Sequence, residues 1–160
     1  MSGTIHLGQD APYPQRYDPN LLQAIARSQA RDAIVKAGDL PFSGFDLWNA
    51  YELSWLNPKG KPELAIAEFS FCAASDNIIE SKSFKYYLNS LNGTVFDSRE
   101  ALASVLTRDL TKASGRDTKV SLYALDEFGT VHMAPGFCVD GLDVSVDHYT
   151  PDAHLLMAGG

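Results

Sequence analysis

The sequence predicts an α+β fold in which an antiparallel sheet is covered on one face by two helices. Two segments with a two-residue apolar period, residues 51–55 and 64–71, flank the turn sequence Asn57-Pro58-Lys59-Gly60. Two segments with a helical period come next, and a further strand pattern follows at residues 120–125. Runs of paired strands on either side of a helix pair are typical of this fold class.

The first two strands are expected to form a β-hairpin. In the first, Tyr51, Leu53 and Trp55 alternate with polar residues, which is the period of a half-buried strand. The sequence between the strands is a strong turn signal. The predicted apolar face of the return strand consists of Ala65, Ala67, Phe69 and Phe71.

Two amphipathic helices are expected after the hairpin. The first ends at Asn92-Gly93, and the second begins at Asp97, with Glu100 in a capping-box arrangement, and ends at Gly115. Spacings of three and four residues place the apolar side chains of each helix on one face. The two predicted stripes are Phe84, Tyr87, Leu88 and Leu91, and then Leu102, Val105, Leu106 and Leu110.

The strand at residues 120–125 leads through a turn at 126–129 into an irregular fourth strand. This strand is expected to begin near Val131 and to continue through residues 137–139 and 144–146. The order after the N-terminal arm is therefore β-β-α-α-β-β.

Residues 1–46 are expected to form an irregular arm, because they hold four of the eight prolines. One short helix is predicted in the arm, at residues 19–28, with Asp18 as N-cap, Pro19 at the first helical position and an apolar stripe. The stripe consists of Leu21, Leu22 and Ile25. Residues 47–149 form the main module, and the tail at 150–160 is expected to be cut off before a second module.

Composition excludes several classes of protein. The chain has 160 residues, of which 45% are hydrophobic, a typical globular content. Thirteen basic and twenty acidic residues give a net charge of −7, which argues against direct nucleic-acid binding. No apolar run approaches the length that spans a bilayer, and the first residues lack the features of a secretory signal. We therefore expect a cytoplasmic protein with a small-molecule partner.

The two cysteines, Cys72 and Cys138, lie in apolar surroundings and form no Cys-x-x-Cys motif. The four histidines show no metal-ligand spacing with them, so no metal site is expected. Two buried thiols are the favoured interpretation, and a catalytic thiol is the alternative. Neither cysteine has a basic neighbour in the sequence to lower its pKa.

The segment Glu80-Ser81-Lys82-Ser83-Phe84-Lys85-Tyr86-Tyr87 lies where the second strand leads into the first helix. Glu80 and Ser81 have a structural interpretation, since a carboxylate near a helix N-terminus stabilises the helix. A functional interpretation uses the same position. A carboxylate accepts two parallel N–H donors from a guanine-like ring, a hydroxyl binds other polar atoms, and Lys82 pairs with a phosphate.

This octapeptide resembles the signature of the NADPH-dependent 7-cyano-7-deazaguanine reductases, the QueF nitrile reductases of queuosine biosynthesis. All of its constrained positions agree with the family pattern: Glu, Ser or Leu, Lys, Ser or Ala, any residue, Lys, Leu or Tyr, and an aromatic. Leu40-Pro41-Phe42, residues 51–57 and Asn77-Ile78-Ile79 resemble the N-terminal half of the tandem members. The resemblance covers roughly residues 17–149.

The resemblance implies a tunnelling fold, whose module has the ββααββ order. It implies that Ile79, Glu80 and Ser81 bind the deazaguanine substrate and that Ser81 and Lys82 bind NADPH. In the reaction that it implies, two hydride transfers reduce the nitrile to a primary amine and yield 7-aminomethyl-7-deazaguanine. A cysteine adds to the nitrile to form a thioimide, and an aspartate donates a proton.

The sequence departs from the family where the nucleophile is expected. The family cysteine lies in a Cys-Pro-x-Thr-Gly-Gln-Pro-Asp stretch, whereas Cys72 is followed by Ala73 and Cys138 by Val139. The His-Glu pair of the family's substrate site is also missing. In tandem members both features lie in the second half, so we assign no catalytic residue to this chain and expect no independent turnover.

Two other interpretations remain open: a non-catalytic module that binds a purine or pterin, and a structural half whose octapeptide only caps a helix. The expected macromolecular partner is a C-terminal catalytic half or a second copy of the chain, because an unpaired sheet edge favours association.

Overall fold

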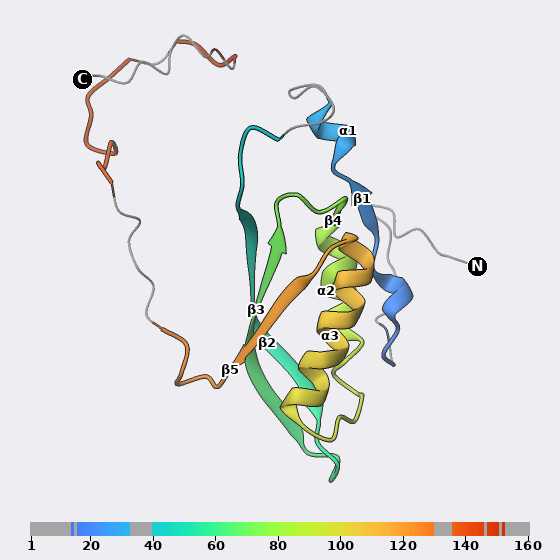
Figure 1. The fold of residues 1–160 in the computed structure, drawn as a ribbon. Coiled ribbons are helices and arrows are strands. Elements are labelled where there is room, and N and C mark those ends of the chain that lie inside the picture. The colour runs from blue at the N-terminus through green and yellow to red at the C-terminus, as the bar shows by residue number, and fades with distance from the viewer. Residues whose placement is uncertain are drawn as a thin grey trace. The chain divides into compact units, whose positions relative to one another are not determined.

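The computed structural model describes residues 14, 16–32, 40–129, 136–145, 147–150 and 152. The chain divides into two units, residues 1–129 and 130–160, and each is considered by itself. The helices and strands of the described residues all lie in the first unit (Figure 1). No helix among these residues combines the length and the apolar character needed to span a bilayer.

The main sheet of the first unit is antiparallel, with the order β2-β3-β5. The strands are β2 (Phe45–Leu56), β3 (Pro62–Cys72) and β5 (Thr118–Tyr123). The helices α2 (Ser81–Asn89) and α3 (Arg99–Ser114) lie on one face of this sheet (Figure 1). The predicted hairpin, the third strand, the two helices and the α+β class are confirmed, and the arrangement is consistent with a tunnelling-fold module.

The core lies between the sheet and the two helices. The predicted apolar face of β3 is almost completely buried, and the Phe69 and Phe84 rings meet edge to face with centroids 4.9 Å apart. Val105 and Leu88, at the margins of the two predicted helical stripes, are only partly buried. The other stripe residues are each at most 3% exposed: Phe84, Tyr87, Leu91, Leu102, Leu106 and Leu110.

A β-bulge in β2 overturns one part of the predicted alternation. Ala50 pairs with Ala67 and Leu53 pairs with Ala65, so β2 holds one extra residue between these pairs. Because a one-residue shift reverses the face on which each side chain lies, Leu53 is buried as predicted while Tyr51 is 61% exposed. The prediction for Tyr51 is therefore wrong.

The predicted helix at residues 19–28 is replaced by three short elements. These are the 3-10 helix η1 (Pro19–Leu21), the strand β1 (Ala24–Ala26) and the helix α1 (Ser28–Arg31). Asp18 caps η1, and Pro19 is its first residue, as predicted. The helix does not continue because β1 pairs antiparallel with β4 (Asn77–Ile79), a long-range ladder that overrides local helical propensity.

The predicted stripe of this arm helix is divided accordingly. Leu21 and Leu22 pack against the core, but Ile25 is exposed on β1. The boundary of α3 also differs from the prediction, since Ser98 is the N-cap in place of Asp97. Gly115 ends α3 as predicted, with a left-handed φ of 80° that favours glycine.

The predicted fourth strand is wrong where it can be compared with the structure. Residues 137–139 and 144–145 form no strand, and the apolar side chains among them are exposed. Val131 and Val146 lie outside the described residues. An apolar alternation specifies a strand only where a partner supplies ladder hydrogen bonds, and no ladder reaches the described part of this segment. The described residues therefore give a main sheet of three strands rather than four.

Candidate functional site

The four residues that the sequence assigns to ligand binding meet at the junction between β4 and α2. Ile79 is the last residue of β4, Glu80 is the N-cap of α2, and Ser81 and Lys82 begin the helix. Their exposure differs, since the Ile79 side chain is buried and Ser81 is exposed. Glu80 and Lys82 are half-buried between these extremes.

Both carboxylate oxygens of Glu80 accept hydrogen bonds from the first turn of α2. The Lys82 amide donates to Oε1 at 2.8 Å, and the Ser83 amide donates to Oε2 at 2.6 Å. The Ser81 hydroxyl lies 3.4 Å from Oε1. The capping interpretation of the octapeptide is thereby confirmed. Each carboxylate oxygen has two lone pairs, so the cap leaves Glu80 acceptor capacity for a ligand.

The electrostatics of this junction favour the ionised form of Glu80. Burial acts in the opposite direction, because desolvation raises the pKa of a carboxyl. The amide hydrogen bonds from Lys82 and Ser83, the Ser81 hydroxyl and the Lys82 charge together outweigh it and lower the pKa of Glu80 from its ordinary value of 4.5. The site therefore holds an oriented anion at neutral pH.

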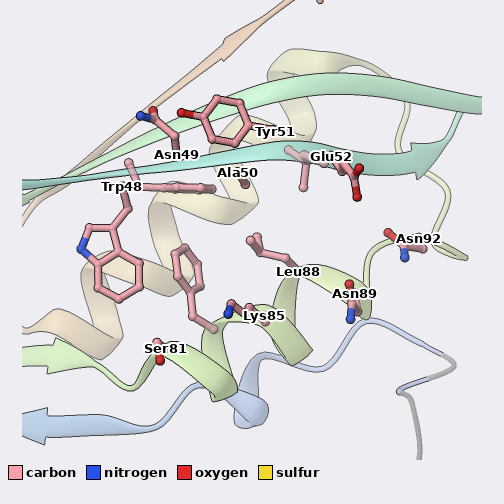
Figure 2. A pocket seen from close by; sticks show the side chains of 13 residues that line it. Trp48, Asn49, Ala50, Tyr51, Glu52, Ser81, Lys85, Leu88, Asn89 and Asn92 are labelled. Carbon is pink, nitrogen blue, oxygen red and sulfur yellow. The ribbon is translucent and has the colours of Figure 1, made fainter. Parts of the chain in front are cut away.

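A cavity of about 470 Å³ lies beside this junction, between the bulged part of β2 and α2. Figure 2 shows Trp48 on the strand side of the cavity, with Ser81, Lys85 and Leu88 on the helix side. An apolar floor with a few polar groups is typical of small-molecule sites. Besides the Trp48 indole, the residues with polar side-chain groups that line it are Asn49, Tyr51, Glu52, Ser81, Lys85, Asn89 and Asn92.

The structure brings Ser81, but not the other three predicted residues, to the cavity. The Lys82 ammonium lies instead above the Tyr86 ring, 6.0 Å from its centroid. Lys85 also lines the cavity, although no ligand role was predicted for it from the sequence. Its signal is the spacing from Ser81, because residues four apart in a helix lie on the same face.

Cys72, which lies in the same unit as the cavity, is not among the residues that line it. Cys72 is partly buried at the end of β3, whereas Cys138 is exposed, so the prediction of two buried thiols is wrong for Cys138. The error follows from its neighbours, since Phe137 and Val139 are apolar but also exposed. Within the ranges that the structure describes, no group of three or more His, Cys, Asp or Glu residues is arranged to hold a metal ion.

Comparison with known proteins gives one family and many relatives. Residues 13–122 match the family described as nitrile reductase, 7-cyano-7-deazaguanine-reductase N-term. A protein of Teredinibacter turnerae is 51% identical over 150 residues, covering 94% of this chain and 54% of the relative. A protein of Saccharophagus degradans is 47% identical over 154 residues, covering 96% of the chain and 58% of the relative.

A Bordetella pertussis protein is 48% identical over 152 residues, covering 94% of the chain and 56% of the relative. All three relatives carry the name NADPH-dependent 7-cyano-7-deazaguanine reductase. The chain thus spans about half the length of the curated relatives that it matches.

Proposed function

The chain belongs to the family of the 7-cyano-7-deazaguanine reductase N-terminal domain, and from that premise we propose that it is the substrate- and cofactor-binding half of such a reductase. The whole enzyme converts 7-cyano-7-deazaguanine to 7-aminomethyl-7-deazaguanine with NADPH, a step of queuosine biosynthesis for tRNA modification. The observation that carries the proposal is the Glu80 carboxylate, which two amides orient at the start of α2, adjacent in sequence to Ser81 in the cavity lining.

Glu80 is the proposed anchor of the deazaguanine ring. Its ionised carboxylate accepts two parallel N–H donors from the ring edge, which is a charge-assisted pair. Ser81 offers an exposed hydroxyl beside it, and Ile79 borders the same position at the end of β4.

Ser81 and Lys82 are the proposed contacts of NADPH, which supplies hydride when it is bound. The donors present fit such a group, because hydroxyl and ammonium groups bind phosphate oxygens. The Lys82 ammonium lies outside the cavity, and Lys85 places a second ammonium at the cavity beside Ser81. The first turns of α2 therefore offer two ammonium groups, one of which lies at the cavity.

The catalytic cysteine is proposed to lie on a C-terminal half, because neither Cys72 nor Cys138 is followed by the residues of the family motif. That half, or a second copy of this chain, is the proposed partner, and the cytoplasm is the proposed location. With a net charge of −7, direct binding of nucleic acid is not part of the proposal.

Consumption of NADPH with 7-cyano-7-deazaguanine tests the proposal directly. We expect no turnover from the 160-residue chain alone and turnover once a separately produced C-terminal half of the Teredinibacter turnerae relative is added. The intact mass of the chain is checked in the same sample. Turnover by the verified chain alone would contradict the assignment of the nucleophile to the other half.

The second candidate function is a non-catalytic module that binds a purine or pterin on the same fold. Cys72, the cysteine in the same unit as the cavity, is not among the residues that line it, and this observation favours the second candidate. Calorimetric titration with 7-cyano-7-deazaguanine, guanine and a pterin separates the candidates. Preference for the nitrile, together with turnover in the reconstituted mixture, supports the reductase. Equal affinities without turnover support the binding module.

A further inference from the structure

The N-terminal arm runs along α2 from the C-terminal end of the helix to its N-terminal end. At the far end, the Asp18 amide donates to Ser90 Oγ at 3.3 Å. At the near end, the Gln23 amide donates to Ser83 Oγ at 3.0 Å. Both serines are fully buried, so each hydroxyl is a fixed internal partner of the arm. This part of the arm reaches Glu80 at Gln23, just before β1 pairs with β4.

Three hydrogen bonds at this near end form a closed ring around Glu80. The Glu80 amide donates to the Gln23 carbonyl at 2.8 Å. The Gln23 amide donates to Ser83 Oγ at 3.0 Å, and the Ser83 hydroxyl donates to the Glu80 carbonyl at 2.7 Å. The ring therefore occupies both the backbone donor and the backbone acceptor of Glu80.

The far end of the arm is held by a buried carboxylate. The Tyr17 hydroxyl donates to Asp109 Oδ2 at 2.6 Å, and the Tyr87 hydroxyl donates to the same oxygen at 2.8 Å. Arg108 donates to the other oxygen through Nε at 3.0 Å. This cluster joins the arm to α2 and α3, so the arm is attached at both ends of its path along α2.

We propose that the Ser83 hydroxyl is a positioning group for Glu80, because it closes the ring that fixes the Glu80 backbone to the arm. Two bonds to the Glu80 main chain set the direction in which the side chain leaves the backbone. The Ser83 amide then binds Glu80 Oε2, so one residue orients both the backbone and the carboxylate. Only the purpose of that orientation, to present the carboxylate to the base, rests on the proposed function.

The titration of Glu80 tests this role without any ligand. Carboxyl NMR of the 160-residue chain measures the pKa of Glu80 in the unchanged protein and in Ser83→Ala. We expect the substitution to move the pKa of Glu80 upward, toward its ordinary value, because the carboxylate loses its alignment with the amides of Lys82 and Ser83. If Ser83 has a merely structural role, the substitution lowers the melting temperature but leaves the pKa of Glu80 unchanged. That result overturns the proposal.

Ser104→Ala is the matched control. Ser104 is an exposed helical serine whose hydroxyl donates to the Glu100 carbonyl at 2.8 Å, and Glu100 is also a glutamate near a helix start with a lowered pKa. We expect this control to leave the pKa of Glu80 unchanged, and Ser83→Ala to leave that of Glu100 unchanged. Equal effects of both substitutions on Glu80 would also overturn the proposal.

Native-state hydrogen exchange keeps the proposal testable even if Ser83→Ala does not fold. In the unchanged chain, the amides of Gln23 and Glu80 are expected to exchange at a common protected rate, because a closed ring opens as a unit. In a folded Ser83→Ala chain, Gln23 exchange accelerates about fivefold, the factor that one hydrogen bond of typical net strength gives. Unprotected exchange at Gln23 in the unchanged chain overturns the proposal. Failure of the base to bind would instead affect only the proposed function.

Discussion

The N-termini of α2 and α3 are both capped by a side chain, but in different ways. At α3, the Ser98 hydroxyl accepts from the Ala101 amide at 3.1 Å in an exposed position. At α2, Glu80 accepts from two amides with both carboxylate oxygens, and the arm holds its backbone from outside the helix. Serine is a preferred N-cap and glutamate is not. Helix stability alone therefore accounts for Ser98 at the start of α3.

The difference bears on the proposed ligand role of Glu80. Glu100 also lies in the first turn of a helix, and hydrogen bonds from its own amide and from Ser98 lower its pKa. Yet Glu100 is exposed, whereas Glu80 is half-buried and its backbone takes part in a ring of hydrogen bonds with another segment. Orientation beyond the needs of capping supports the proposal that Glu80 binds a ligand.

The largest expected effect is that of Glu80→Gln on base binding. The amide keeps the size of the side chain but replaces one acceptor oxygen with a donor, which would break the proposed charge-assisted pair with the base. Affinity for 7-cyano-7-deazaguanine should fall by about 1.5–3 kcal/mol, roughly 10- to 150-fold. Calorimetric titration of the reconstituted enzyme measures it. Glu100→Gln is the matched control at the other helix start, and unchanged affinity in Glu80→Gln would remove Glu80 from the site.

The converse experiment removes the serine cap at the start of α3. Ser98→Ala removes the only side-chain cap recorded for α3 among the described residues, and it should lower the free energy of unfolding by about 1 kcal/mol. Urea denaturation measures the change. Base affinity should stay at the level of the unchanged chain, because Ser98 lies outside the cavity lining. A loss of affinity equal to that of Glu80→Gln would show that helix capping alone accounts for both sites.

The sequence predicted the carboxylate cap of α2 correctly but placed the start of α3 at Asp97, one residue before its N-cap Ser98. Local patterns were sufficient for the hairpin, the two apolar stripes and the carboxylate cap, since each depends on neighbours within one or two turns. The ring around Glu80 was not predictable in this way, because Gln23 and Ser83 are 60 positions apart. The false arm helix has the same cause, as its residues pair with β4 instead. Tyr51 was misplaced by a bulge, which depends on the register with β3.

The pH dependence of stability should distinguish Glu80 from the other carboxylates. The folded pKa of Glu80 is lowered below 4.5, so its stabilising contribution is fully present above that value and is lost as pH falls through the folded pKa. The difference in unfolding free energy between the unchanged chain and Glu80→Gln should therefore shrink in acid. Urea denaturation from about pH 7 to about pH 3 measures this. A difference that stays constant across the range would contradict an ionised cap.

The smallest expected effect concerns the two lysines that flank Ser81. Lys82→Ala removes an ammonium from the outer side of the junction, and Lys85→Ala removes one from the cavity. An exposed ion pair contributes about 0.2–1 kcal/mol, so the KM for NADPH should rise roughly 1.5- to 5-fold in the lysine variant that loses the phosphate contact. The KM for the nitrile should change less. Steady-state kinetics of the reconstituted enzyme compare the two. A rise confined to Lys85→Ala would move the phosphate contact into the cavity, and equal rises for both substrates would remove Lys82 from cofactor binding.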